Sequence, residues 1–299
     1  MRRPPAPDKA EKKVETKRKK KLLNNLAAFG LVLPAFLTVM LVVAYPIVSS
    51  VLRSFRNLKT NAFTMEHYTY FFKNPLERGS LIFTMVIVVI TVALAIVLSY
   101  LLAMYLRFSK TRASKIIGVL YLIPRFLPGL VAIYGMIAII RDTGFLNRVS
   151  LLFGGDFKPG FMFNPKGIVL MNIWFNIPFA TLIITSGLSG IPDSVIEGAR
   201  DVGAGKWMVF THMILPLSIK DVFIAATFVF MGNVGAFTTP FLMMGATNPT
   251  MLGILLYRQF NSYMDYEKTA ALSVIMFLIC SLSAAVYIYT NLKEKDWQK

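Results

Sequence analysis

The sequence has very few of the residues that hold metals or form covalent cross-links. Its 299 residues include one cysteine, Cys280, and two histidines, His67 and His212. One cysteine cannot form an intrachain disulfide, and two histidines so far apart lack the spacing of a metal site. The sequence therefore predicts neither a disulfide framework nor a resident metal. Cys280 lies in an apolar run and is expected to be a packing residue.

Acidic residues are also scarce. The chain has 15 Asp and Glu against 32 Lys and Arg, a formal net charge of +17. No acidic residue lies in the middle of a long apolar run, which argues against an ion-coupled secondary transporter. His, Asp and Glu do not cluster beside the apolar runs either, which argues against a membrane enzyme. Ten of the basic residues fall in the first 21 positions, before an apolar run. They are explained by membrane topology and by attraction to anionic lipid, so no nucleic-acid partner is expected.

Long apolar runs are abundant. Hydrophobic residues make up 56% of the chain and the mean hydropathy is +0.59. At about 20 apolar residues per crossing, the sequence predicts an all-α membrane protein with six transmembrane helices within 22–293. The predicted spans are 26–51, 80–106, 116–140, 167–189, 219–244 and 270–289. The first run is too long for a signal peptide and is expected to remain as a span.

Basic residues in the short connections predict the orientation of the chain. The tight connection 107–115 carries Arg107, Lys110, Arg112 and Lys115 and no acid. The excess of Lys and Arg marks the cytoplasmic side. With six spans, both termini are then cytoplasmic. Residues 1–21 are predicted to be a disordered basic cytoplasmic tail and residues 294–299 a cytoplasmic C-terminal tail.

The connection 190–216 has the pattern of two short helices with a turn between them. Pro192 and Asp193 suit a helix start, and Gly203-Ala204-Gly205 permits a sharp turn. Trp207, Phe210 and Met213 then form an apolar stripe, and Pro216 is predicted to start the next span.

This connection resembles the EAA loop of binding-protein-dependent ABC importer permeases. The family pattern is Glu-Ala-Ala, three residues, Gly, nine residues, then Ile-x-Leu-Pro. Five residues stand at those spacings: Glu197, Ala199, Gly203, Leu215 and Pro216. Two positions differ, because Gly198 replaces the middle residue of Glu-Ala-Ala, an alanine, and Met213 replaces the isoleucine. The resemblance covers about residues 25–290. It implies the type I ABC importer permease fold and a multi-pass protein of the bacterial inner membrane.

In that family the loop docks into a cleft on a cytoplasmic ATPase, and its glutamate pairs with a basic group there. The resemblance therefore implies a coupling role for Glu197, Gly198, Ala199, Gly203, Leu215 and Pro216. The alternative is that Glu197 is a solvated helix residue and Gly203 an ordinary helix cap.

The resemblance also implies partners. They are two copies of an ATP-binding subunit, a second permease subunit that is identical or different, and an extracytoplasmic solute-binding protein. The sequence has no Gly-rich phosphate loop. We therefore expect a non-catalytic chain that binds no cofactor, with ATP and Mg used by the partner ATPase.

Polar residues inside the spans are candidates for a translocation path. Asn172 and Asn176 lie in the fourth predicted span, and Asn233 and Thr238 lie in a Gly- and Pro-containing stretch, 231–240, that is expected to interrupt the fifth. Non-helical backbone at membrane depth is tolerated only where protein covers it or where it lines a water-filled cavity. The alternative is that these side chains only bond neighbouring helices.

Arg125 lies within the third predicted span, between Pro124 and Pro128. An ionisable residue at membrane depth indicates a functional site. The alternative, which we expect, is a structural role in which the guanidinium snorkels or binds carbonyls freed by the prolines.

The solute is only weakly indicated. Phe237–Leu242, Tyr257–Phe260 and Ala270–Leu272 resemble permeases of the polyamine, phosphonate and ferric-iron branch. This resemblance implies a small polar or charged solute. A sugar-importer permease of the same fold is the first alternative, and a secondary transporter is the more remote one. The lack of acids within the spans, together with Arg125, favours an anionic solute over a polyamine.

Overall fold

The computed structural model describes residues 29–57, 60, 62–245 and 247–295. The predicted tail 1–21 and residues 296–299 lie outside this part of the chain. Within it the regular elements are helices, with one isolated bridge between Arg56 and Phe63. In chain order they are η1 (Met40–Ala44), α2 (Tyr45–Ser54), α3 (Glu66–Lys73), α4 (Pro75–Phe108), α5 (Arg112–Leu120), α6 (Ile123–Phe126), α7 (Gly129–Ile140), α8 (Phe145–Leu152), α9 (Pro165–Ser189), α10 (Asp193–Asp201), α11 (Lys206–Val209), η2 (Phe210–Ile214), α12 (Leu215–Val234), α13 (Thr238–Met244), α14 (Leu252–Asn261) and α15 (Tyr266–Lys295).

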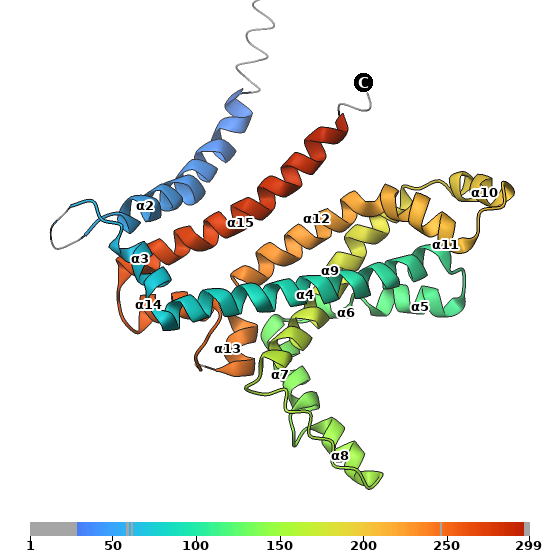
Figure 1. Cartoon of the computed structure of the whole chain (residues 1–299), viewed down its shortest axis with the longest axis horizontal. Coiled ribbons are helices and arrows are strands. Elements are labelled where there is room, and N and C mark those ends of the chain that lie inside the picture. Colours follow the sequence, from blue (N-terminus) through green and yellow to red (C-terminus); the bar gives the residue numbers. More distant parts are fainter. Residues whose placement is uncertain (1–28, 58–59, 61, 246, 296–299) are drawn as a thin grey trace, which may run out of the picture.

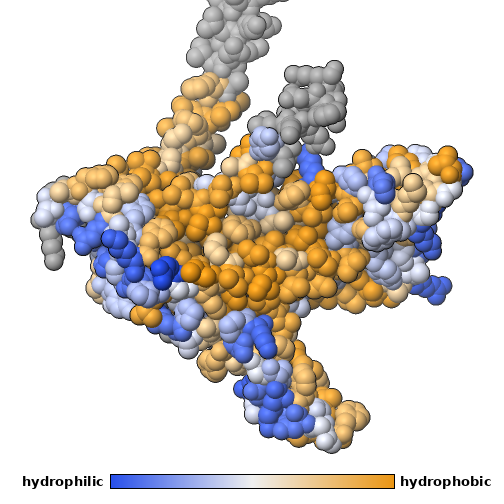
Figure 2. Space-filling model, viewed as in Figure 1, coloured by the Kyte–Doolittle hydropathy of each residue, from blue (hydrophilic) through white to orange (hydrophobic). Residues whose placement is uncertain are grey.

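Six helical segments of the described chain are long and apolar enough to cross a membrane, so the prediction of an all-α protein with six spans is confirmed. Figure 2 shows apolar residues covering the middle of the visible face, with hydrophilic residues gathered toward its ends. The segments are Phe29–Ser54, Pro75–Phe108, Gly129–Leu152, Pro165–Ser189, Lys206–Val234 and Tyr266–Tyr289.

The centre of the molecule is built from α4, α9 and α12, which pack against one another (Figure 1). Small residues such as Ala95, Ala103, Ala180 and Ala225 are fully buried between them. Small side chains let helices approach closely, which is how helices associate when surrounded by lipid. The first span is different, because none of its most apolar window is buried within the chain.

The third predicted span, 116–140, is not one helix. The chain forms α5, α6 and α7 there, and the apolar segment long enough to span is Gly129–Leu152. Leu127 is extended, with ψ of 136°, because the ring of the following Pro128 disfavours helical backbone at the residue before it. The hydropathy pattern placed the span correctly in order but did not reveal that its first half is interrupted.

The second half of the 190–216 connection also differs from the prediction. Pro216 lies in the first turn of α12, but α11 and η2 run into α12 without a break, so the helical segment begins earlier, at Lys206. Proline cannot donate a backbone hydrogen bond and crowds the carbonyl four residues earlier. Here the π-helical turn η2 immediately precedes it, and Leu215 N–H donates to Phe210 O. The widened turn accommodates the proline and lets the helix continue. The same arrangement, η1 before Pro46, occurs in the first span.

A buried pair of hydroxyls on α4 holds the start of α14. The Leu252 N–H donates to Thr84 Oγ1 at 3.0 Å, and the Thr250 N–H donates to Ser80 Oγ at 3.3 Å. Both hydroxyl-bearing residues are buried. The link satisfies amides at a helix N-terminus, which have no partners within their own helix.

Replacing Thr84 by valine is expected to destabilise the purified protein. The substitution keeps the shape but leaves the Leu252 amide buried without an acceptor, at a cost of about 1–3 kcal/mol. Thr91 supplies the control, because it is equally buried on α4 but its hydroxyl has no partner in the described residues. The unfolding temperature in detergent should fall for Thr84→Val and not for Thr91→Val. Equal effects of the two substitutions would contradict the proposed cap.

Candidate functional site

The helix α10 projects from the end of the bundle, where α9 ends and the long Lys206–Val234 helix begins (Figure 1). Its inner face is apolar: Ile196 is buried, and Ala199 packs against the same cluster. Glu197 and Gly198 are exposed on the outer face. Leu215 is half-buried and Pro216 is exposed further along the loop. The structure therefore presents a carboxylate and a glycine side by side on an anchored helix.

The turn after α10 depends on Gly203. Its φ of +88° lies in the left-handed region that favours glycine. The Gly203 N–H donates to Arg200 O at 2.9 Å, and the Ala204 N–H donates to Ala199 O at 3.0 Å. This pair of bonds is a Schellman motif, and it fixes the direction in which the chain leaves α10.

Apolar side chains flank the turn on the outer surface. Val202 is 84% exposed, Trp207 75% and Met208 57%. The stripe predicted at Trp207, Phe210 and Met213 is thus divided, because Phe210 turns inward and packs edge-on against Tyr100. We call Val202, Trp207 and Met208 the loop patch. Of these three residues, only Trp207 was identified from the sequence, because isolated exposed apolar residues do not follow the helical repeat that identifies a buried face.

Arg107 ties α10 to the bundle. Its Nη2 lies 2.7 Å from Asp193 Oδ1 and donates to Ile191 O at 3.1 Å, while its Nε donates to Leu188 O at 3.3 Å. One guanidinium at the end of α4 therefore satisfies carbonyls at the end of α9 and holds the first residue of α10. The sequence identified Arg107 only as one basic residue of a topology signal. Its role depends on three segments meeting in space.

Replacing Arg107 by methionine is expected to loosen α10. Hydrogen bonds to charged groups contribute about 1.5–3 kcal/mol, whereas the exposed ion pair alone contributes little. Hydrogen exchange of the Asp193–Asp201 amides should quicken by about tenfold or more. Arg112→Met removes the same charge from an exposed position in the same connection and should leave those amides unchanged. If both variants exchange at the wild-type rate, Arg107 does not anchor the helix.

A second site lies at membrane depth, where α9, α12, α13 and α7 meet. It is a cavity of about 340 Å³, and its lining includes Asn172, Asn176, Asn233 and Thr238. The remaining lining residues are Gly129, Leu130, Ile133, Phe175, Gly232, Ala236 and Thr239. We call this cavity the amide pocket. It forms where the chain is not helical, between the end of α12 at Val234 and the start of α13 at Thr238. Four of the polar residues named from the sequence as path candidates therefore line one cavity.

The three asparagines of the amide pocket are partly satisfied by one another. Asn233 Nδ2 donates to Val229 O at 2.6 Å, and Asn176 Nδ2 donates to Asn172 O at 2.7 Å. Asn176 Nδ2 also lies 3.5 Å from Asn233 Oδ1. Asn172 is 4% exposed, and its Nδ2 has no hydrogen-bond partner among the described residues. An unpaired buried donor is costly, so a bound solute or water with an acceptor oxygen would stabilise this wall.

The structural role expected for Arg125, in which it snorkels or binds carbonyls freed by the prolines, stays a prediction. Its side chain is exposed, and its guanidinium donates no hydrogen bond to a carbonyl in the described residues. Instead its Cζ lies 5.0 Å from the centroid of the Phe179 ring. A cation over an aromatic face is attracted by the ring quadrupole. The guanidinium therefore remains available for a further partner.

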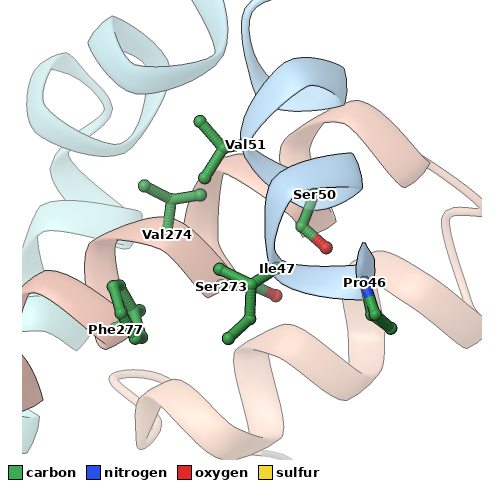
Figure 3. Close-up of a pocket in the computed structure, with 7 residues that line it drawn as sticks. All are labelled: Pro46, Ile47, Ser50, Val51, Ser273, Val274 and Phe277. Atoms are coloured by element: carbon green, nitrogen blue, oxygen red, sulfur yellow. The ribbon is translucent and has the colours of Figure 1, made fainter. Parts of the chain in front are cut away.

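Two other cavities have different lining. Figure 3 shows the crevice of about 270 Å³ between α2 and α15, where Ile47 and Val51 face Val274 and Phe277. It is apolar apart from two serines, which suits packing between the first and last spans. Another cavity, of about 500 Å³, is lined by Tyr121, by Asp221 and by five residues of α9, namely Leu182, Ile183, Thr185, Ser186 and Ser189.

Comparisons with known proteins agree with this architecture. Residues 95–294 match the family described as "Binding-protein-dependent transport system inner membrane component". The spermidine/putrescine transport system permease protein PotB of Escherichia coli is 26% identical over 226 residues, covering 75% of this chain and 82% of PotB. The sulfoquinovosyl glycerol transport system permease protein SmoG of Agrobacterium fabrum is 29% identical over 288 residues, covering 89% of this chain and 90% of SmoG.

Solved structures share the fold. A chain of the bacterial alginate ABC transporter, in complex with its alginate pentasaccharide-bound periplasmic protein, superposes with a TM-score of 0.75 at 14% identity and covers 90% of this chain and 94% of that one. A chain of the MetNI methionine ABC transporter gives a TM-score of 0.55 at 18% identity, covering 72% of this chain and 94% of that one.

Proposed function

Since this chain belongs to the family of binding-protein-dependent transport system inner membrane components, we propose that a separate ATPase drives it through the surface of α10 and the loop patch. Members of this family are multi-pass permeases of bacterial ABC importers. Glu197, Gly198, Ala199, Gly203, Leu215 and Pro216 form or support this surface. The chain itself performs no catalysis, and ATP with Mg is used by the partner.

The observation that carries this proposal is the continuity between the two sites. The helix Lys206–Val234 begins beside the loop patch and ends at the amide pocket. Movement imposed on the loop is therefore transmitted along a single rigid element to the cavity wall. Arg107 adds a second connection, from α10 to α4. Asn172, Asn176, Asn233 and Thr238 are the proposed translocation path.

The proposed assembly contains two copies of the ATP-binding subunit, a second permease subunit and an extracytoplasmic solute-binding protein. The unburied first span supports a partner within the membrane. The solute is small and polar or charged; PotB suggests a polyamine, and SmoG together with the alginate transporter suggests an acidic sugar or saccharide. Reconstituting this chain with its ATPase, partner permease and binding protein tests the proposal. ATP hydrolysis should rise when loaded binding protein is added, and a complex that does not assemble would refute it.

The orientation of the termini is a further prediction. The two connections that contain Arg107 and the loop patch must lie in the cytoplasm for the loop patch to meet the ATPase, and six spans then place both termini there. A reporter enzyme that is active only outside the cytoplasm, fused after Lys293, should be inactive. The matched fusion within 154–160, between α8 and α9, should be active. An active fusion after Lys293 would overturn the topology.

A further inference from the structure

The amide pocket and Arg125 contact the same face of α9. Asn172, Asn176 and Phe179 lie at i, i+4 and i+7 on α9, so they share a face of that helix. Phe179 is three residues beyond Asn176, a rise of about 4.5 Å. The Arg125 guanidinium is stacked on that ring. The chain that follows Arg125 returns to the pocket within four residues, because Gly129 and Leu130 line it.

The chemistry of this surface is unsuited to a cation. The described lining of the amide pocket contains neutral amides, hydroxyls and the Phe175 ring, and no carboxylate. The carboxylate of Asp221 packs against α9 at Gly187. Gly187 is eight residues beyond Phe179, about 12 Å along the helix. The Arg125 guanidinium, which contacts α9 at Phe179, is therefore nearer to the pocket along that helix than the Asp221 carboxylate.

We propose that the amide pocket and Arg125 form a binding site for a polyhydroxylated anion, such as a sugar acid or a sulfonated or phosphorylated polyol. The unpaired Asn172 Nδ2 donates to a solute hydroxyl or ring oxygen. Thr238 and Thr239 offer hydroxyls, and Phe175 offers an apolar face for the solute's CH groups. Arg125 pairs with the anionic group at one end. This inference rests on the proposed function and names its substrate class; a polyamine would meet like charge with no compensating acid.

The test measures the electrostatics of the pocket directly. Cys280 is the only cysteine of the sequence, so Cys280→Ala gives a cysteine-free background in which Thr238→Cys places one thiol on the pocket wall. The purified full-length chain, in detergent and without its partners, is treated with anionic sulfonatoethyl methanethiosulfonate or with its cationic trimethylammonioethyl counterpart. Modification is followed by the intact mass of this chain. The quantity compared is the ratio of the two modification rates, anionic reagent over cationic reagent. Because Arg125 attracts the anionic reagent, Arg125→Gln should lower this ratio about tenfold.

Three further measurements complete the test. Arg125→Lys should preserve the ratio, and Arg141→Gln, which removes a charge from the far end of α7, should not change it. D-glucuronate should slow modification more than D-glucose, spermidine should give no protection, and Arg125→Gln should abolish the advantage of glucuronate. Protection by spermidine equal to that by glucuronate, a ratio independent of Arg125, or a thiol inert to both reagents would each overturn the proposal. Labelling needs neither ATP nor binding protein, so failure here is distinct from failure of the complex to assemble.

Discussion

Replacing Glu197 by lysine is expected to abolish co-purification of the ATPase and with it solute-stimulated ATP hydrolysis. Glu197 is exposed on the outer face of α10, so its carboxylate is free to pair with a basic group of the ATPase when the loop docks. Losing one partner of a buried charge pair costs about 3–5 kcal/mol, and the lysine adds repulsion between like charges. A loss of about 3 kcal/mol already weakens binding more than a hundredfold.

The chain offers a matched control for this change. Asp201 is also exposed on α10, one turn further on and outside the positions of the EAA pattern. Asp201→Lys changes the net charge equally and should retain most of the docking. Both variants should reach the membrane at wild-type levels, because neither position lies within the bundle. If the two variants lose docking equally, the effect is one of overall charge and Glu197 has no specific partner.

Replacing Gly203 by valine should uncouple the complex by a different route. A β-branched residue resists the φ of +88° at this position, so the Schellman turn is lost and α10 leaves the bundle at another angle. Glu197 keeps its charge, but its carboxylate no longer faces the basic group of the ATPase. We expect solute-stimulated ATP hydrolysis to fall about tenfold or more, because left-handed backbone costs about 1–2 kcal/mol without glycine and relaxation displaces the docking surface.

Gly205 provides the same substitution in the same turn without the strain. Its φ is −68° and its ψ 162°, a conformation that valine adopts readily, and a Cβ there meets nothing within 4 Å. Gly205→Val should therefore retain stimulation. Gly203→Ala should give an intermediate loss, since alanine also avoids positive φ. Wild-type stimulation in Gly203→Val would show that the direction of α10 does not govern coupling.

The spacing of the loop was the most informative feature of the sequence. It placed a glycine where the structure has positive φ, and it placed Glu197 on an exposed helical face. The amide pocket was also within reach, because an interruption at membrane depth must be covered and Asn172, Asn176 and Asn233 were the polar residues available to cover it. In both cases a local pattern carries the information.

The features that sequence reasoning missed depend on contacts between distant segments. Arg107 meets carbonyls more than 80 residues away, so no window of sequence contains the interaction. Pro216 was assigned to the start of a span and lies in the first turn of α12, but a π-helical turn joins that helix to α11, so the helical segment begins earlier, at Lys206. Arg125 lies over the Phe179 ring on α9, more than 50 positions away, and no window of sequence contains that contact.

The helix α12 behaves as a lever of 20 residues. The π-helical turn η2 precedes it, and the interruption at Gly235 follows it. A helix of that length is about 30 Å long. A tilt of only about 6° about one end displaces the other by about 3 Å, which is the length of a hydrogen bond. Asn233 stands at the far end, 3.5 Å from Asn176. A small rotation of α12 at the loop is thus enough to make or break the contact between those two amides. A small change of angle at the ATPase side therefore switches a hydrogen bond in the lining of the amide pocket on or off.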